Sequence, residues 1–141
     1  MSVYKRIFLD TNPIIYFLEK QNENANTVRK FLTIATENES EFYTSTITDA
    51  EFLVYPYMEN NQESIEAYYD FIRNLHVLKC FVTEDIAEKS AQIRAKYPSI
   101  KLGDSIQLAA SIDCGCDCFY TNDSQLKQVT EVNVVYLGDI E

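Results

Sequence analysis

Residues 6–17 read RIFLDTNPIIYF, and this stretch decides how the rest of the chain is interpreted. The apolar residues 7–9 predict the end of a buried strand, and Asp10 places a carboxylate where that strand stops. Apolar side chains resume at once after Pro13, which a helix accepts in its first turn, so we expect a helix over residues 12–20. The sequence therefore predicts an acidic side chain at the rim of the hydrophobic core.

Strands and helices are expected to alternate along the whole chain. Strands are expected at 5–9, 41–44, 76–82, 118–121 and 132–136. Helices are expected at 12–20, 24–37, from about 46–48 until Pro56, 62–74, from an N-cap at Thr83 until Pro98, and 102–113. This alternation favours an α/β architecture with a mostly parallel, right-handed wound sheet.

Composition limits the class of protein. The 141 residues are enough for one domain, residues 1–141, and 46% of them are hydrophobic, which argues against disorder. No apolar run approaches the roughly 20 residues that span a bilayer, and the first apolar run is too short for a signal peptide. We therefore expect a cytoplasmic protein without a membrane segment.

The net charge of −10 is unfavourable for binding nucleic acid by bulk electrostatics. Any contact with nucleic acid is therefore expected to be local, assisted by a metal ion, or helped by a basic partner.

Cysteine and histidine offer little catalytic chemistry. Cys114, Cys116 and Cys118 are too closely spaced for a structural zinc site, and Cys80 supplies no second pair. We expect the cysteines of this run to be reduced and packed at a helix-to-strand junction. His76 is the only histidine and lies among apolar residues, so we expect it to be structural.

Four acids occupy comparable places in the predicted elements. Asp10 and Asp123 follow strands, whereas Glu51 and Asp104 lie early in helices that begin at the same end of the sheet. Ligands of such sheets bind outside the carboxyl ends of the strands. The four carboxylates are therefore candidates for one shared site.

Bringing these acids together requires a counter-ion. Two carboxylates about 5 Å apart repel by roughly 3 kcal/mol at an effective dielectric near 20. Mg²⁺ and Mn²⁺ prefer oxygen ligands, can activate a bound water and can neutralise charge on a phosphoryl oxygen. We therefore interpret Asp10 as a metal ligand held by the strand that precedes it.

Each acid also has a structural interpretation. Asp10 and Asp104 could cap the helices that follow them, and Asp123 could be a turn residue. Glu51 is harder to explain structurally, because it lies among Ala50, Phe52 and Leu53.

Four motifs resemble those of the PIN-domain family, the metal-dependent nucleases that include VapC-like toxins of toxin–antitoxin pairs. In chain order they are Asp10-Thr-Asn, Thr48-Asp-Ala-Glu51 followed by Phe-Leu-Val-Tyr-Pro56, Leu102-Gly-Asp104-Ser-Ile-Gln-Leu-Ala-Ala110, and Gly115-Cys-Asp117-Cys-Phe-Tyr-Thr-Asn-Asp123. None is specific alone, but their order and spacing cover nearly the whole chain.

The resemblance implies a three-layer α/β/α domain with a five-stranded parallel sheet in the order 3-2-1-4-5. It implies that Asp10, Glu51, Asp104 and Asp123 are the catalytic residues and hold one or two Mg²⁺ or Mn²⁺ ions. Thr11, Asn12 and Thr121 are implied as supporting residues. The implied activity is cleavage of RNA by an endoribonuclease that forms a homodimer and is restrained by a cognate antitoxin.

The chain is more acidic than is expected of a nuclease that binds RNA without help from a partner. Arg94, Lys96 and Lys101 precede Asp104 and are the candidates for contacts with the RNA backbone, although they could equally be ordinary surface cations.

Two other functions compete with the nuclease. A non-catalytic PIN-like binding module would keep the fold without using the acids. A phosphatase with Asp10 as nucleophile would want a second aspartate two residues later, where this chain has Asn12.

Overall fold

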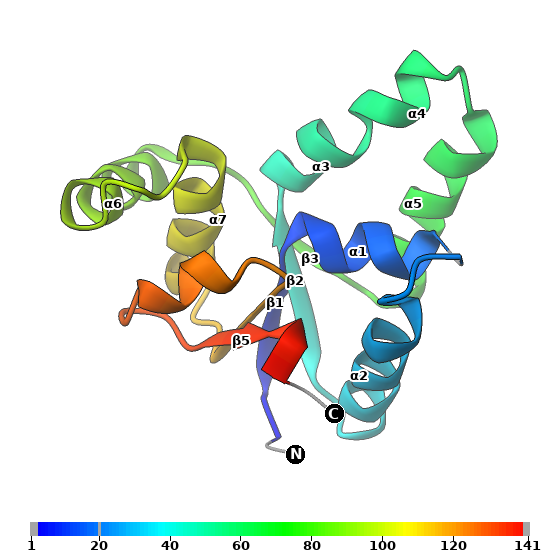
Figure 1. Ribbon diagram of the computed structural model, residues 1–141, viewed down its shortest axis with the longest axis horizontal. Helices are drawn as coiled ribbons and strands as arrows, with labels where there is room; N and C mark the ends of the chain where they lie inside the picture. The colour runs from blue at the N-terminus through cyan, green and yellow to red at the C-terminus, as the bar shows by residue number, and fades with distance from the viewer. Residues whose placement is uncertain (1–2, 20, 140–141) are drawn as a thin grey trace.

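Five short strands form one parallel sheet in the order β3-β2-β1-β4-β5 (Figure 1). The computed structural model describes residues 3–19 and 21–139. The strands are β1 Arg6–Leu9, β2 Glu41–Ser45, β3 Leu78–Cys80, β4 Cys118–Thr121 and β5 Val134–Tyr136. The predicted α/β class and strand order are confirmed. They place β1 at the centre, between β2 and β4.

Helices connect successive strands, as a parallel sheet requires. They are α1 Thr11–Leu18, α2 Ala25–Glu37, α3 Thr46–Phe52, α4 Val54–Met58, α5 Gln62–Asn74, α6 Glu84–Lys96 and α7 Leu102–Asp113, with 3₁₀ turns η1 Ser124–Gln128 and η2 Leu137–Asp139. The predicted cap at Thr83 is confirmed, because its hydroxyl accepts a 3.2 Å hydrogen bond from the Ile86 N–H. No helix in these described segments has the length and hydrophobicity that a membrane span requires.

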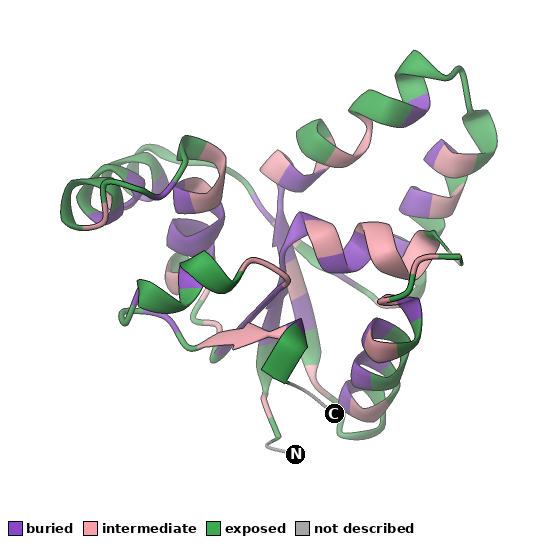
Figure 2. Cartoon of the chain, in the orientation of Figure 1, coloured by how far each residue is buried: buried purple, intermediate pink, exposed green. Residues whose placement is uncertain are grey.

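The alternation of side chains along β1 divides the core into two layers. Ile7 and Leu9 pack with residues of α1, α2 and α5, whereas Phe8 packs with residues of α6 and α7. Figure 1 shows these two groups of helices on opposite sides of the sheet, and Figure 2 shows burial concentrated in the strands and the inner helix faces. The result is a three-layer α/β/α domain.

Two predicted boundaries are wrong. The helix expected to end before Pro56 breaks at Leu53, and Pro56 lies inside α4. It occupies the first turn of that helix, where a missing N–H breaks no intrahelical bond. The strand expected over residues 76–82 contracts to β3, because His76 adopts a left-handed backbone conformation (φ 51°) in the turn after α5.

The cysteines differ from the prediction. Cys80 at the end of β3 and Cys114 at the end of α7 form a disulfide, so the expectation of a reduced thiol is wrong for Cys114. Cys116 and Cys118 are free thiols. These two cysteines are 34 residues apart, and no spacing motif in the sequence links them.

Candidate functional site

Each predicted acid lies at an element boundary on the carboxyl side of the sheet. Asp10 directly follows β1, Asp123 is the second residue after β4, and Asp104 lies in the first turn of α7. Glu51 lies in α3, the helix that starts immediately after β2, but it is the last residue but one of that helix, so the prediction that it lies early in the helix is wrong. Because β1, β2 and β4 are adjacent and parallel, their carboxyl ends meet at one edge of the sheet. The topology thus directs all four segments to the same place.

The charges of these acids interact with one another. Burial is the main reason that the pKa of Asp10 rises from 3.8 to about 7, and the nearby charges of Asp104 and Glu51 raise it further. The pKa of Asp104 is also raised, first by burial and then by Asp123 and Glu51, while Lys101 opposes the shift. The four predicted acids therefore form one electrostatic group.

Three of the four carboxylates have partners within the protein. The Thr11 N–H donates to Asp10 (2.9 Å), the Gln125 N–H donates to Asp123 (3.0 Å), and the Thr11 hydroxyl donates to Glu51 (2.6 Å). The interpretations of Asp10 as a helix cap and of Asp123 as a turn residue are thus confirmed. A capping role for Asp104 is wrong, because Lys101 occupies the N-cap position of α7.

The donor set suits a hard divalent cation, since it consists of carboxylate oxygens, and burial disfavours the ionisation of two of them, Asp10 and Asp104, without a counter-ion. In the side-chain arrangement of residues 3–19 and 21–139, no three His, Cys, Asp or Glu side chains are placed to hold one metal ion. The acids thus fit the cation by their chemistry and by their mutual charge, while oxygens of Asp10, Glu51 and Asp123 accept hydrogen bonds from protein donors.

Two threonine hydroxyls orient the acids. Thr121 donates to Asp10 (2.8 Å) and accepts from the Asp123 N–H (3.1 Å), so one side chain links two of the acids. Thr11 links α1 to α3 through Glu51. The third predicted supporting residue, Asn12, is half-buried in the first turn of α1.

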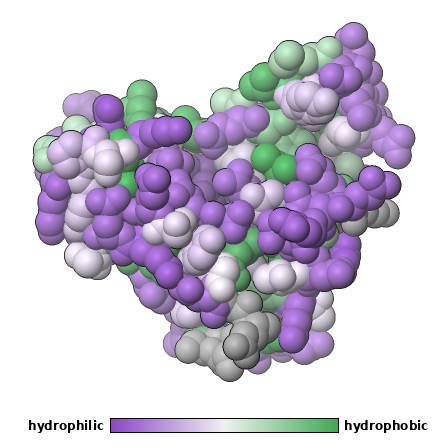
Figure 3. All heavy atoms as spheres, viewed as in Figure 1, coloured by the Kyte–Doolittle hydropathy of each residue, from purple (hydrophilic) through white to green (hydrophobic). Residues whose placement is uncertain are grey.

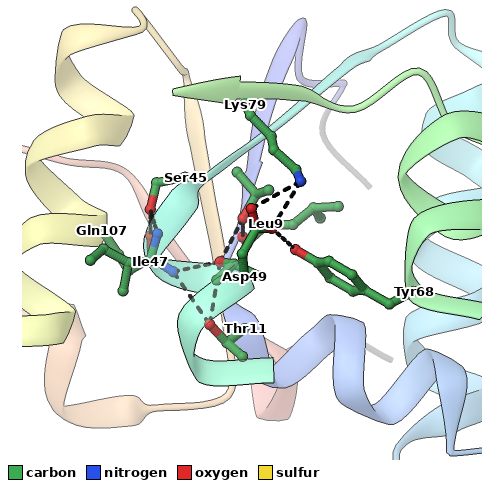
Figure 4. Close-up of polar contacts among 10 residues, drawn as sticks. Leu9, Thr11, Ser45, Ile47, Asp49, Tyr68, Lys79 and Gln107 are labelled. Atoms are coloured by element: carbon green, nitrogen blue, oxygen red, sulfur yellow. Dashed lines mark hydrogen bonds and ion pairs between the residues drawn. The ribbon is translucent and has the colours of Figure 1, made fainter. Parts of the chain in front are cut away.

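A buried polar network beneath the acids was not predicted from the sequence. Gln107 of α7 is fully buried, and its amide nitrogen donates to Thr48 (2.7 Å) and Thr11 (3.3 Å). Its amide oxygen accepts from the Ser45 hydroxyl (Figure 4). The hydroxyl groups of Thr48 and Thr44 are 2.7 Å apart. A signal was present, because Gln107 interrupts an otherwise apolar run one helical turn after Asp104.

A second unpredicted cluster lies on the other side of α3. Asp49 accepts hydrogen bonds from the Tyr68 hydroxyl and from the Lys79 ammonium, whose nitrogen lies 2.9–3.0 Å from the carboxylate oxygens (Figure 4). The Lys79 ammonium also lies 5.6 Å from the centre of the Tyr68 ring. These contacts tie α3 to α5 and β3, two residues before Glu51.

The predicted RNA-contacting cations differ in their surroundings. Arg94 donates to the Ile100 carbonyl (3.4 Å), and Lys96 pairs with Glu131 (3.3 Å). Lys101 is exposed, and its charge acts on Asp104. Lys101 is therefore the one of the three whose charge is linked to the acidic group.

A pocket of about 330 Å³ adjoins Glu51. Apolar side chains of α1 and α3, including Ile15 and Phe52, line it together with Glu19 and Glu59. Beside it, α4 exposes Tyr57 and Met58, which are 62% and 72% accessible. Figure 3 shows hydrophobic side chains over α4 on a face that is otherwise mostly hydrophilic.

The sequence matches the family model described as PIN domain over residues 7–132. The chain belongs to the PIN domain family. The matched range contains all four acids, β2, β3, β4 and all of β1 except Arg6, and it ends two residues before β5. No match is found among curated proteins.

Solved structures of similar fold come from toxin–antitoxin systems. VapBC2 from Rickettsia felis, bound to a DNA fragment from its promoter, aligns with a TM-score of 0.76 and 15% identity, over 93% of this chain and 98% of that chain. FitAcB from Neisseria gonorrhoeae aligns with a TM-score of 0.72 and 23% identity, over 95% and 99%. VapC20 from Mycobacterium tuberculosis, described as a toxin that cleaves the sarcin–ricin loop, aligns with 0.70 and 17%, over 90% and 98%. These likenesses agree with the PIN fold described above.

Proposed function

We propose that this PIN domain is a divalent-metal-dependent endoribonuclease that hydrolyses RNA phosphodiester bonds. The observation that carries the proposal is the mutual electrostatic influence of Asp10, Glu51, Asp104 and Asp123, which come from four separate segments. Membership of the PIN domain family and the fold shared with an RNA-cleaving toxin support the same conclusion.

The four acids would hold one or two Mg²⁺ or Mn²⁺ ions. Such an ion, when bound, supplies charge neutralisation at the scissile phosphate and lowers the pKa of a coordinated water. The chain itself contributes orientation: Thr121 holds Asp10, Thr11 holds Glu51, and the strand behind Asp10 limits its movement. Lys101 is proposed to contact the RNA backbone, with Arg94 and Lys96 as weaker candidates because they have intramolecular partners.

A cleavage assay tests this proposal. Purified protein should cleave a mixed RNA pool with Mn²⁺, and a chelator should abolish the cleavage. Asp104→Asn should reduce the rate by about 100-fold or more, the scale expected when a metal ligand or charge-stabilising group is lost. Asp113→Asn is the matched control, since it makes the same change at the exposed far end of the same helix. Equal activity of wild type and Asp104→Asn would contradict the proposal.

The proposed biological role is the toxin of a type II toxin–antitoxin pair, acting in the cytoplasm. Similar folds are found in the VapBC and FitAcB systems named above. A cognate antitoxin is expected to place a basic side chain near the acids, because a cation there offsets their repulsion. A neighbouring gene for a small DNA-binding protein, and neutralisation of toxicity when both genes are expressed, would test this role.

A homodimer is also proposed. The exposed apolar side chains of α4, among them Tyr57 and Met58, are unusual on a monomer surface when they lie together. Light scattering should give twice the chain mass, and Met58→Glu should shift the protein toward monomer if α4 lies in the interface.

The alternative is a non-catalytic PIN-like binding module. It is favoured by the absence, among residues 3–19 and 21–139, of three side chains placed to hold a metal ion. Calorimetry separates the two functions: the nuclease should bind Mn²⁺ in a manner that depends on Asp10 and Asp104, whereas the binding module should not.

A further inference from the structure

We propose that Gln107 is a positioning residue that sets the hydrogen-bond direction of Thr11 and thereby holds Glu51 in the acidic group. This inference rests on the proposed function, because its consequence for metal binding assumes that Glu51 is a metal ligand. The proposal adds a buried, uncharged residue of α7 to the candidate site, whose four acids lie at the ends of helices and strands.

The position of Gln107 makes it a link between three of the acid-bearing segments. It lies three residues after Asp104, close to one turn of α7. Its amide contacts Thr11, which directly follows Asp10, and Thr48, which lies one turn before Glu51 in α3. One side chain thus joins the three segments that carry Asp10, Glu51 and Asp104.

The hydrogens of this network have a single consistent direction. Thr44 donates its only hydroxyl hydrogen to the Leu9 carbonyl (2.8 Å), so Thr48 must donate in the 2.7 Å contact between the two threonines. Thr48 therefore accepts from the Gln107 amide. Ser45 donates its hydrogen to the amide oxygen of Gln107, and that bond fixes which end of the amide faces the threonines.

Thr11 connects the buried network to the acids. Its hydroxyl accepts from the Gln107 amide nitrogen at 3.3 Å and lies 2.6 Å from a Glu51 oxygen. Because an amide nitrogen only donates, the Thr11 hydrogen is left for Glu51. The bond to a carboxylate is also stronger than the 3.3 Å contact between Thr11 and Thr48.

Burial gives the network its rigidity. Gln107, Ser45, Thr44 and Thr48 are all fully inaccessible to solvent, so water cannot replace a lost partner. A buried polar group without a partner is costly, and the network is therefore expected to persist in one arrangement.

Two substitutions test the proposal. Gln107→Met keeps the length of the side chain and removes its donors and acceptor. Gln107→Glu keeps the shape but replaces the amide donors with acceptor oxygens, which compete with Glu51 for the Thr11 hydrogen. Ser90→Ala is the matched control: it removes a buried hydroxyl that bonds to Ser105 of α7 (2.6 Å), in a hydrogen bond separate from this network.

The first measurement uses metal-free protein. Three-bond couplings to the Thr11 methyl group report its χ1 rotamer. In folded wild type and Ser90→Ala they should show one rotamer, and in both Gln107 variants they should show averaging. A single unchanged rotamer in a folded Gln107→Met variant would overturn the proposal.

The second measurement is calorimetric titration with Mn²⁺ together with RNA cleavage. Gln107→Met should weaken Mn²⁺ binding by about tenfold, the lower end of the effect of losing a direct partner of a metal ligand, because Gln107 acts on Glu51 through Thr11, and it should lower kcat more than it changes KM. Ser90→Ala should bind Mn²⁺ within about twofold of wild type, even if its melting temperature falls equally. Equal Mn²⁺ affinity of Gln107→Met and wild type would overturn the proposal. If wild type itself neither binds Mn²⁺ nor cleaves RNA, the proposed function fails, and the Thr11 couplings still decide whether Gln107 positions Thr11.

Discussion

The Thr121 hydroxyl donates a 2.8 Å hydrogen bond to the carboxylate of Asp10, joining the last residue of β4 to the residue that follows β1. The adjacent parallel strands bring these side chains together although they are 111 residues apart. This bond lowers the pKa of Asp10, whereas burial raises it more strongly. Asp10 is therefore an acid whose ionisation depends on its neighbours.

Replacing Thr121 with valine should weaken Mn²⁺ binding near pH 7. Without the hydroxyl donor, the pKa of Asp10 should rise above its value of about 7, so that the ion must displace a proton. The difference in Mn²⁺ affinity between the variant and wild type should shrink as the pH is raised toward 9, where Asp10 is ionised in both proteins. Calorimetry across this range checks the effect, with exposed Thr130→Val as the control. Equal affinities at pH 6.5 would contradict it.

Asp10→Asn should stabilise the metal-free protein at neutral pH. The folded-state pKa of Asp10 is raised from 3.8 to about 7, so the folded state binds more protons than the unfolded state between these values. Wild-type stability due to this group should therefore fall as pH rises from about 4 to 7. Asp10→Asn has no carboxyl group to titrate here, so its unfolding free energy does not fall in this way. The variant should therefore exceed wild type in unfolding free energy by at most about 4 kcal/mol at pH 8, and the difference should vanish below pH 4.

Urea unfolding at several pH values measures this difference between the two proteins. Saturating Mn²⁺ should stabilise wild type but not Asp10→Asn, because binding to the folded state adds stability only where the ligand is present. A constant difference in unfolding free energy from pH 4 to pH 8 would disprove the prediction.

Tyr68→Phe should destabilise the protein by about 1–2 kcal/mol, because the Asp49 carboxylate loses a partly buried hydroxyl donor. The adjacent Tyr69→Phe is the control, since Tyr69 is 41% exposed and should change stability by less than about 0.5 kcal/mol. Chemical denaturation gives both values. Equal effects of the two substitutions would show that the hydroxyl bond to Asp49 contributes nothing.

Lys101→Gln should lower kcat/KM for RNA without weakening Mn²⁺ binding. One fewer phosphate contact should reduce the slope of log(kcat/KM) against log salt by about 0.7 for single-stranded RNA. Lys96→Gln should leave this slope unchanged, because Lys96 is already paired with Glu131. The same slope in wild type and Lys101→Gln would remove Lys101 from the RNA contact.

Intact-mass analysis after alkylation without reductant should find two modified cysteines under denaturing conditions, because Cys80 and Cys114 form a disulfide. The native protein should react slowly, since burial raises the pKa of Cys116 to about 12 and raises that of Cys118 as well. Rapid modification of four cysteines would contradict both expectations.

Several features of the site were visible in the sequence because they depend on neighbouring residues. Asp10 follows three apolar residues, and Asp104 opens an apolar helix, so local patterns place both acids at element ends. Parallel strands then bring such ends together as a matter of topology. Gln107 is visible in the sequence as a polar residue in an apolar run, but its role is not, because its hydrogen-bond partners are the distant residues 11, 45 and 48.

The sequence by itself determined the order of strands and helices, since hydrophobic periodicity within a short segment is enough to set which face is buried. Tertiary structure alone decided which distant side chains meet: Thr121 with Asp10, Lys79 with Asp49, and Cys80 with Cys114. The physical reason is that each of these contacts depends on how whole elements pack and in which register, a property that no segment of the chain carries by itself.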